Sequence, residues 1–221
     1  MCHLKKANMK KYCLIILILS ISLQSYTQKT KTGELTFKIP VTACVFGDIA
    51  SQSAGIGFGL EKQYKPQYSF NQDIIYLFHD AKNTSGAISF FQPVNSLTGL
   101  KLVSGLRRYF SGGEKPSGFF LELDLMNMYT YSQLSAGQLD YNVHRYRCQV
   151  TINPGIMVYN KPDKSGIMTM ELLVGAGLGY VYTNSKISTN PQQEKIPDDF
   201  YTWKGIYPML NMDFKIGLLL N

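Results

Sequence analysis

The chain has 221 residues, and its charged fraction of 17% is below the roughly 25% of an ordinary soluble domain. Aromatic residues make up 13%, with 15 Tyr and 12 Phe against a single Trp, and the formal net charge is +7. This length suits one all-β domain or barrel, and the composition excludes a disordered, collagen-like or disulfide-dense chain.

Residues 1–27 have the layout of a secretory signal peptide. Four lysines precede an apolar core at 13–23, which is shorter than the about 20 residues that a membrane-spanning helix needs. Ser25 and Thr27 are the small residues before an expected cleavage site at Gln28. Because the four lysines leave with the signal, the 22 basic residues fall to 18 against 15 acidic ones. We therefore do not infer nucleic-acid binding from the net charge.

Eight segments after residue 28 alternate with period 2, and no helical pattern of useful length appears there. Each segment has one apolar face and one face that carries glycines and charged residues. Such alternation predicts β-strands with two chemically different faces. The predicted strands are 35–46, 54–62, 68–79, 100–110, 118–133, 146–159, 168–182 and 208–220.

Two architectures fit this alternation, and they differ in which face meets water. A soluble ligand-binding barrel or sandwich would bury the apolar face, whereas an outer-membrane barrel turns it towards lipid. The patterned runs of about 9 to 13 residues match tilted membrane-spanning strands, and aromatic residues gather towards the ends of the apolar stripes. Short turns also alternate with longer polar loops such as 132–140. We therefore expect residues 28–221 to form an eight-stranded antiparallel up-and-down transmembrane β-barrel.

The face opposite the apolar residues carries charged side chains, which we expect to line the barrel interior. Buried charges need partners, and counting register across the hairpins provides some. The expected pairs are Arg107 with Glu122, Arg147 with Asp124, and Glu171 with Lys215. The whole predicted interior network is Lys38, Asp73, Lys101, Arg107, Glu122, Asp124, Arg145, Arg147, Glu171, Asp213 and Lys215.

Three prolines lie in or beside the predicted strands, at Pro40, Pro154 and Pro208. Proline lacks the backbone N–H that a strand ladder uses, so we expect bulges or shortened pairing at these positions.

Four stretches carry a family resemblance: the signal ending "SYTQ", the glycine-alternating "GIGFGLE" and "LLVGAGLGYVY", and the closing "LNMDFKIGLLLN". On these stretches residues 28–221 resemble the small eight-stranded outer-membrane barrels of the OmpA/OmpX-like class. They are most similar to the outer-membrane β-barrel families of Bacteroidetes, which include PorT-like proteins. The chain departs from that pattern by ending in Asn221 rather than in an aromatic residue, and Phe214 could stand in for it.

The resemblance implies a cell-envelope protein of a Gram-negative bacterium with a structural or interaction role, such as an accessory of secretion or adhesion. The implied partners are outer-membrane lipid and lipopolysaccharide, the barrel assembly machinery, and an envelope protein that binds the extracellular loops. Eight strands enclose only enough room for side chains, so a wide porin channel is not expected.

A lipid-acting enzyme at the barrel rim is the main alternative of another class. His79 with Asp80, and His144, are the candidate catalytic residues, because a histidine beside a carboxylate supports general-base chemistry. No nucleophile motif of the GxSxG kind accompanies them, so we expect no enzymatic activity. The sequence also contains no metal-ligand cluster and no cofactor motif, and we expect neither a metal nor a cofactor.

Two further features bear on sites. Cys44 and Cys148 fall on opposite faces of the first and sixth predicted strands, a geometry that cannot form a disulfide. The longest loop, 185–205, contains Tyr201 and the single Trp203. Long loops on rigid scaffolds often carry function, so these two aromatic residues are candidates for an interaction site.

Overall fold

The computed structural model describes residues 35–42, 53–79, 94–110, 118–136, 139–160, 168–187 and 204–220. The predicted signal peptide at 1–27 lies outside the described residues. Eight strands make up nearly all of the described part: β1 (Leu35–Pro40), β2 (Ser53–Lys65), β3 (Tyr68–His79), β4 (Val94–Tyr109), β5 (Gly118–Ala136), β6 (Leu139–Asn160), β7 (Met168–Ile187) and β8 (Gly205–Leu220).

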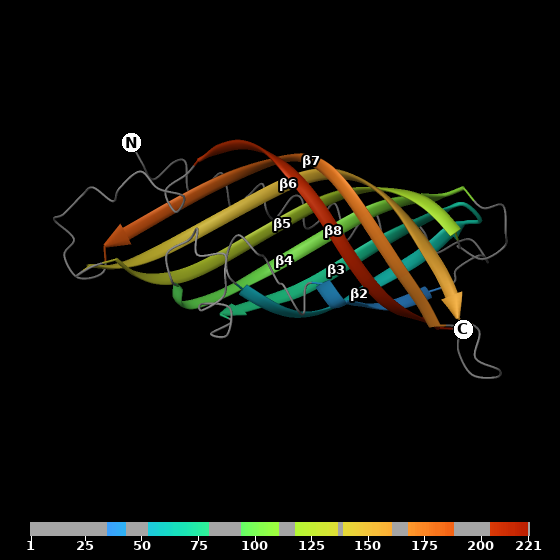
Figure 1. Ribbon diagram of the computed structural model, residues 1–221, viewed down its shortest axis with the longest axis horizontal. Helices are drawn as coiled ribbons and strands as arrows, with labels where there is room; N and C mark the ends of the chain where they lie inside the picture. The colour runs from blue at the N-terminus through green and yellow to red at the C-terminus, as the bar shows by residue number, and fades with distance from the viewer. Residues whose placement is uncertain are drawn as a thin grey trace.

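The eight strands form a single closed sheet (Figure 1). Each strand pairs antiparallel with the next along the chain, and β1 pairs antiparallel with β8 to close the ring. The predicted all-β architecture of eight antiparallel up-and-down strands is therefore confirmed. No helix in the described part of the chain is long and apolar enough to cross a membrane.

We call the two ends of the barrel the turn end and the loop end. The turn end is where β2 meets β3, between Lys65 and Tyr68, and also where the β4–β5 and β6–β7 connections lie. The loop end is the opposite end, with the β3–β4, β5–β6 and β7–β8 connections.

Strands β5, β6 and β7 are longer than predicted, at 19, 22 and 20 residues. They reach farther than β2, β3 and β4 at the loop end, on the left of Figure 1. The predicted loop at 132–140 was wrong, because β5 continues to Ala136 and β6 begins at Leu139. Its serine residues obscured the strand pattern, although Ser132 and Ser135 pair with Val143 and Asp140 in the β5–β6 ladder.

Strand β1 is shorter than predicted, with six residues. It ends at Pro40, and the next two residues, Val41 and Thr42, are helical, so the predicted strand over 35–46 was wrong at these positions. Proline removes a backbone donor, which explains an end of pairing there. Positions 43–46 lie outside the described residues.

The other two prolines perturb the sheet less. Pro154 pairs with Leu121 of β5, but the ladder to β7 skips from Ile152 to Gly155 without a change of register. Pro208 pairs with Leu178 of β7 in an unbroken ladder. The prediction of shortened pairing therefore holds at Pro40 and Pro154, whereas the recorded register shifts lie elsewhere, in β2 and β4.

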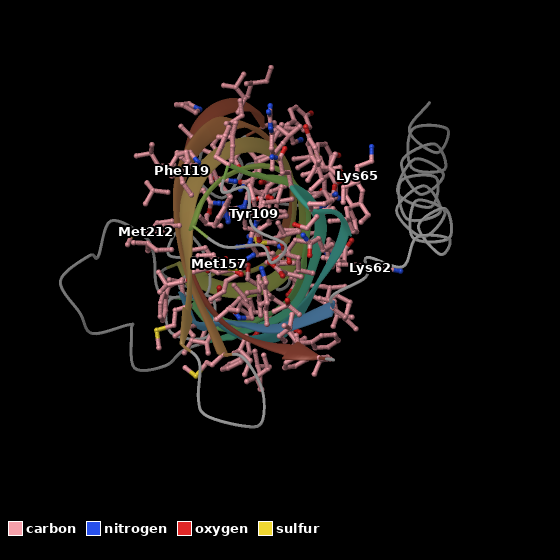
Figure 2. All side chains as sticks on the ribbon, turned by 90° about the vertical axis from the view of Figure 1, so that its right-hand side faces the viewer. Lys62, Lys65, Tyr109, Phe119, Met157 and Met212 are labelled. Atoms are coloured by element: carbon pink, nitrogen blue, oxygen red, sulfur yellow. The ribbon has the colours of Figure 1, made fainter. Side chains whose placement is uncertain are left out.

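The two faces of the sheet are chemically opposite. In β5 the side chains of Phe120, Glu122 and Asp124 are buried, whereas Leu121 and Leu123 between them are exposed. The same alternation continues around the ring, so large apolar side chains cover the outside and polar or charged ones fill much of the inside. Figure 2, which looks along the barrel from the turn end, shows Phe119 and Met212 outside the ring and Tyr109 and Met157 within it.

Some glycines on the inner face lie so close to the neighbouring strand that a Cβ would not fit there. At Gly177 of β7, an added Cβ would contact the backbone carbonyl oxygen of Val150 and lie 2.7 Å from the Thr151 Cα, both in β6. Backbone atoms held in a ladder cannot move aside easily, so any larger residue at this position overpacks the wall.

We predict that Gly177→Ala lowers the free energy of unfolding by about 1–3 kcal/mol, because the new methyl group meets backbone rather than a flexible side chain. Urea titration of the purified, folded protein, followed by far-ultraviolet circular dichroism, measures the change. Ala176→Val adds volume at the neighbouring outward-facing position and is expected to change stability by less than about 0.5 kcal/mol. Equal effects of the two substitutions would contradict the assignment of faces.

Candidate functional site

The predicted charged residues lie on the inner face of the barrel. Nine of the eleven are buried, and the other two, Lys101 and Asp213, are half-buried. Removing so many charges from water is costly unless each charge is paired and hydrogen-bonded. The arrangement of partners therefore decides whether this interior is stable. The nine buried residues are Lys38, Asp73, Arg107, Glu122, Asp124, Arg145, Arg147, Glu171 and Lys215.

Arg107 of β4 is the centre of the first group of charges. Its guanidinium forms an ion pair with Glu122 through Nε and Nη2. Its Nη1 lies 3.1 Å from Glu61 Oε2 and 2.9 Å from Glu171 Oε2. One side chain thus binds three carboxylates from three strands, which the five donors of a guanidinium allow. Lys38 of β1 adds a second cation through ion pairs with Glu61 and Glu171.

This first group has two cations and three carboxylates, and neutral donors complete its hydrogen bonding. Ser69 and Tyr109 both donate to Glu61, the latter at 2.6 Å. Asn71 Nδ2 lies 3.4 Å from Glu122 Oε1. Donors of this kind replace lost water and stabilise the excess negative charge.

An apolar cluster lies next to Arg107 on the side of the turn end. It consists of Tyr109, Phe120, Met157 and Leu173, each at most 1% exposed. The Arg107 guanidinium carbon lies 3.9 Å from the centre of the Phe120 ring, within range of a cation–π interaction. Figure 2 shows Tyr109 and Met157 projecting into the ring at this end. The cluster therefore fills the bore beside the charges.

Lys215 of β8 is the centre of a second group. Its Nζ lies 2.6 Å from Asp73 Oδ2 and 3.7 Å from Asp213 Oδ2. Lys101 is close enough to the same two aspartates to interact with them electrostatically. Asp124 accepts a 2.7 Å hydrogen bond from Asn153 Nδ2. This group also combines two cations with three carboxylates.

The three predicted pairs have different outcomes. Arg107 and Glu122 face each other in the ladder and form an ion pair, as predicted. Glu171 and Lys215 also face each other, but their ion pairs are with other residues. The third prediction was wrong, because Arg147 pairs with Met128 whereas Asp124 pairs with Thr151, four positions farther along the ladder.

Arg145 and Arg147 lie closer to the loop end, and both are buried. Arg147 interacts with Tyr207 of β8. These two cations offset the excess of carboxylates in the two groups described above.

Sequence reasoning missed Glu61, which is 2% exposed and contacts both cations of the first group. The signal was present, because Glu61 lies two positions after Gly59 on the same face of β2. With Glu61 included, the described interior contains six basic and six acidic residues and is formally neutral. The basic residues are Lys38, Lys101, Arg107, Arg145, Arg147 and Lys215, and the acidic ones are Glu61, Asp73, Glu122, Asp124, Glu171 and Asp213.

His144 lies apart from the charged interior. His144 lies on the outward-facing side of β6, where its Nδ1 is 2.7 Å from the Tyr129 hydroxyl and its ring centroid is 4.9 Å from that of Tyr131. His79 ends β3, and β4 and β5 separate that strand from β6. The described contacts of His144 are thus with tyrosines, not with a serine and a carboxylate.

Several other sequence candidates lie outside the described residues, namely Asp80, Cys44, Tyr201 and Trp203. Cys148 is on the outward-facing side of β6, opposite Tyr180 of β7. Within the described strands, no group of three or more His, Cys, Asp or Glu side chains could hold a metal ion.

No protein-family model, curated protein or solved structure matches this chain. Its function is therefore argued from its own geometry.

We predict that Arg107→Met destabilises the protein by about 3–5 kcal/mol, because it leaves three buried carboxylates without their shared cation. Urea titration of the folded protein measures the loss. Arg108→Met, at the next residue, is the matched control, since Arg108 is exposed on the outer face and its loss should cost less than about 1 kcal/mol. A similar cost for both substitutions would show that the interior does not depend on the Arg107 contacts.

Proposed function

We propose that this chain is an integral outer-membrane β-barrel protein with a structural or interaction role in the cell envelope. One observation carries the proposal: large apolar side chains cover the outside of a closed barrel whose inside is charged and self-neutralised. A soluble protein rarely exposes contiguous apolar patches above a few hundred Å², whereas a membrane barrel requires them on the lipid-facing side.

The height of the apolar band supports a membrane location. Along β5, Tyr129 lies ten positions after Phe119, and these two aromatic residues are near opposite ends of the band. At about 3.3 Å per residue and a tilt of about 40°, this stretch is roughly 25 Å high. That value matches the apolar band of transmembrane β-barrels, which aromatic girdles flank at both interfaces.

The filled interior supports a role other than bulk transport. Arg107, its carboxylates and the cluster around Phe120 occupy the bore at the turn end with side chains. Eight strands leave little further space. An envelope protein that acts through its surfaces fits this interior better than a porin does. A role as an accessory of secretion or adhesion, in line with the PorT-like resemblance, belongs to the same proposal.

The two alternatives have less support. A soluble ligand-binding barrel would turn its apolar face towards a cavity, whereas Leu121, Leu123 and Ile152 are 40–55% exposed on the outside. A rim enzyme built on His144 would need a nucleophile and a carboxylate beside it, and its described contacts are Tyr129 and Tyr131.

We predict that the protein fractionates with the outer membrane and migrates faster in gel electrophoresis before boiling than after it. A closed barrel in which every strand pairs on both sides resists detergent until heated, because unpaired backbone groups are costly in an apolar medium. A water-soluble product with no shift on boiling would contradict the membrane location.

We further predict that Leu123→Arg impairs folding into lipid vesicles by about 2–4 kcal/mol, since residue 123 lies near the middle of the apolar band. Tyr131→Arg, near the edge of the band, should cost at most about 1 kcal/mol. Folding is measured as the fraction of heat-modifiable protein at increasing urea. In a soluble barrel both substitutions would add charge to a wet surface, so equal and small effects would count against the proposal.

A further inference from the structure

We propose that the outer surface of β2, β3 and β4 at the turn end binds the phosphate group of an anionic glycerophospholipid. The inference rests on the proposed membrane location, because it places the site at the edge of the apolar band. Three cations carry it, Lys62, Lys65 and Arg108, which we call the rim cations. Lys65 and Arg108 are exposed and Lys62 is half-buried, and Figure 2 shows both lysines pointing away from the ring.

Strand register brings the rim cations together. Tyr68 of β3 pairs with Lys65 on one side and with Arg108 on the other. Adjacent strands are about 4.8 Å apart, so the backbones of Lys65 and Arg108 are about 10 Å apart across β3. Lys62 pairs with Phe70 on the same surface. Long basic side chains at this spacing can contact one phosphate group together.

Aromatic rings surround the Arg108 side chain at this site. The Arg108 guanidinium carbon lies 5.9 Å from the Tyr68 ring centre and 5.4 Å from that of Phe110. Tyr64 stacks on Tyr68 at 6.2 Å, and Phe110 lies 5.6 Å from Phe119. Such rings orient the guanidinium while leaving its N–H donors free to bind an anion.

The charge of the outer surface selects an anionic ligand. Among the outward-facing side chains that the structure describes, none is a carboxylate, so no described carboxylate competes for the rim cations. The inward-facing cations Lys38, Arg107 and Lys215, by contrast, each form ion pairs with buried carboxylates. The rim cations therefore have no counter-charge within the described outer surface.

The position of the rim cations selects a lipid rather than a free anion. Leu60, Phe70 and Leu106 continue the same surface towards the middle of the barrel, and Leu60 and Leu106 are 40% and 52% exposed. A ligand with a phosphate at the rim and acyl chains along these side chains satisfies both parts of the surface. Basic residues near an anionic membrane surface are attracted to it electrostatically.

The test uses the whole folded barrel in detergent with equimolar phosphatidylglycerol and phosphatidylcholine of identical acyl chains. Native mass spectrometry measures which lipid is retained. We expect the wild type to prefer phosphatidylglycerol and the triple variant K62Q/K65Q/R108Q to lose that retention by at least about tenfold. Inorganic phosphate should not displace the lipid, because it lacks the acyl contacts.

Single substitutions provide the control. Lys65→Gln should weaken retention of phosphatidylglycerol, whereas Lys204→Gln should not. Lys204 is an exposed cation at the loop end, where its Nζ lies 5.1 Å from the Tyr182 ring centre. Equal retention of both lipids by the wild type, equal effects of Lys65→Gln and Lys204→Gln, or displacement by inorganic phosphate would each overturn the lipid site.

The same samples distinguish failure of the site from failure of the proposed function. Each variant is first tested for the shift on boiling and for insertion into vesicles. A wild type that does not insert would overturn the proposed membrane location itself. An inserted barrel without lipid preference would overturn only the site, and the single variants keep the test decisive if the triple variant does not fold.

Discussion

The rest of the structure depends on the ion pairing of three buried carboxylates with one guanidinium, that of Arg107. Apolar side chains fill only part of the interior of this barrel, and the charged side chains that fill the rest must satisfy one another. Glu61, Glu122 and Glu171 come from β2, β5 and β7, and Arg107 links them across the bore. Its contacts with Glu61 and Glu171 couple β4 to β2 and β7, with which β4 shares no backbone hydrogen bonds.

The chemical difference between the two faces of the sheet and the ion pairs across the bore both depend on the register of the strands. A shift of register by one residue would move a buried carboxylate such as Glu122 to the outside and an exposed leucine such as Leu123 to the inside. Because such a slip would cost both the ion pairs and the apolar exterior, the pairing of the strands is strongly specified. Small residues such as Gly177 are needed where the ladder leaves no space inside the wall. The strand register that brings the charged side chains together inside the barrel also places the large apolar side chains outside it.

Much of the fold could be predicted from period-2 alternation, because burial on one face leaves a regular trace in the sequence. The Arg107–Glu122 pair followed from the same counting, since a hairpin fixes its own register. Contacts across the bore could not be predicted this way. Lys215 contacts Asp73 rather than the facing Glu171, and that choice depends on the three-dimensional shape of the interior. The last residues of β5 and the first residues of β6 were not predicted as strand, because polar residues continue the ladder there and no apolar face marks it.

Strand β1 closes the ring with few residues, and this has a consequence for how the chain folds. Its six residues pair with the last six of β8, so that Leu35 meets Leu220. Joining segments so distant in sequence carries a large loss of loop-closure entropy, and non-local contacts of this kind form late in folding. The longest ladders, between β5, β6 and β7, link neighbouring segments and carry no such penalty. We therefore expect the sheet to nucleate in its second half and to close at β1 last.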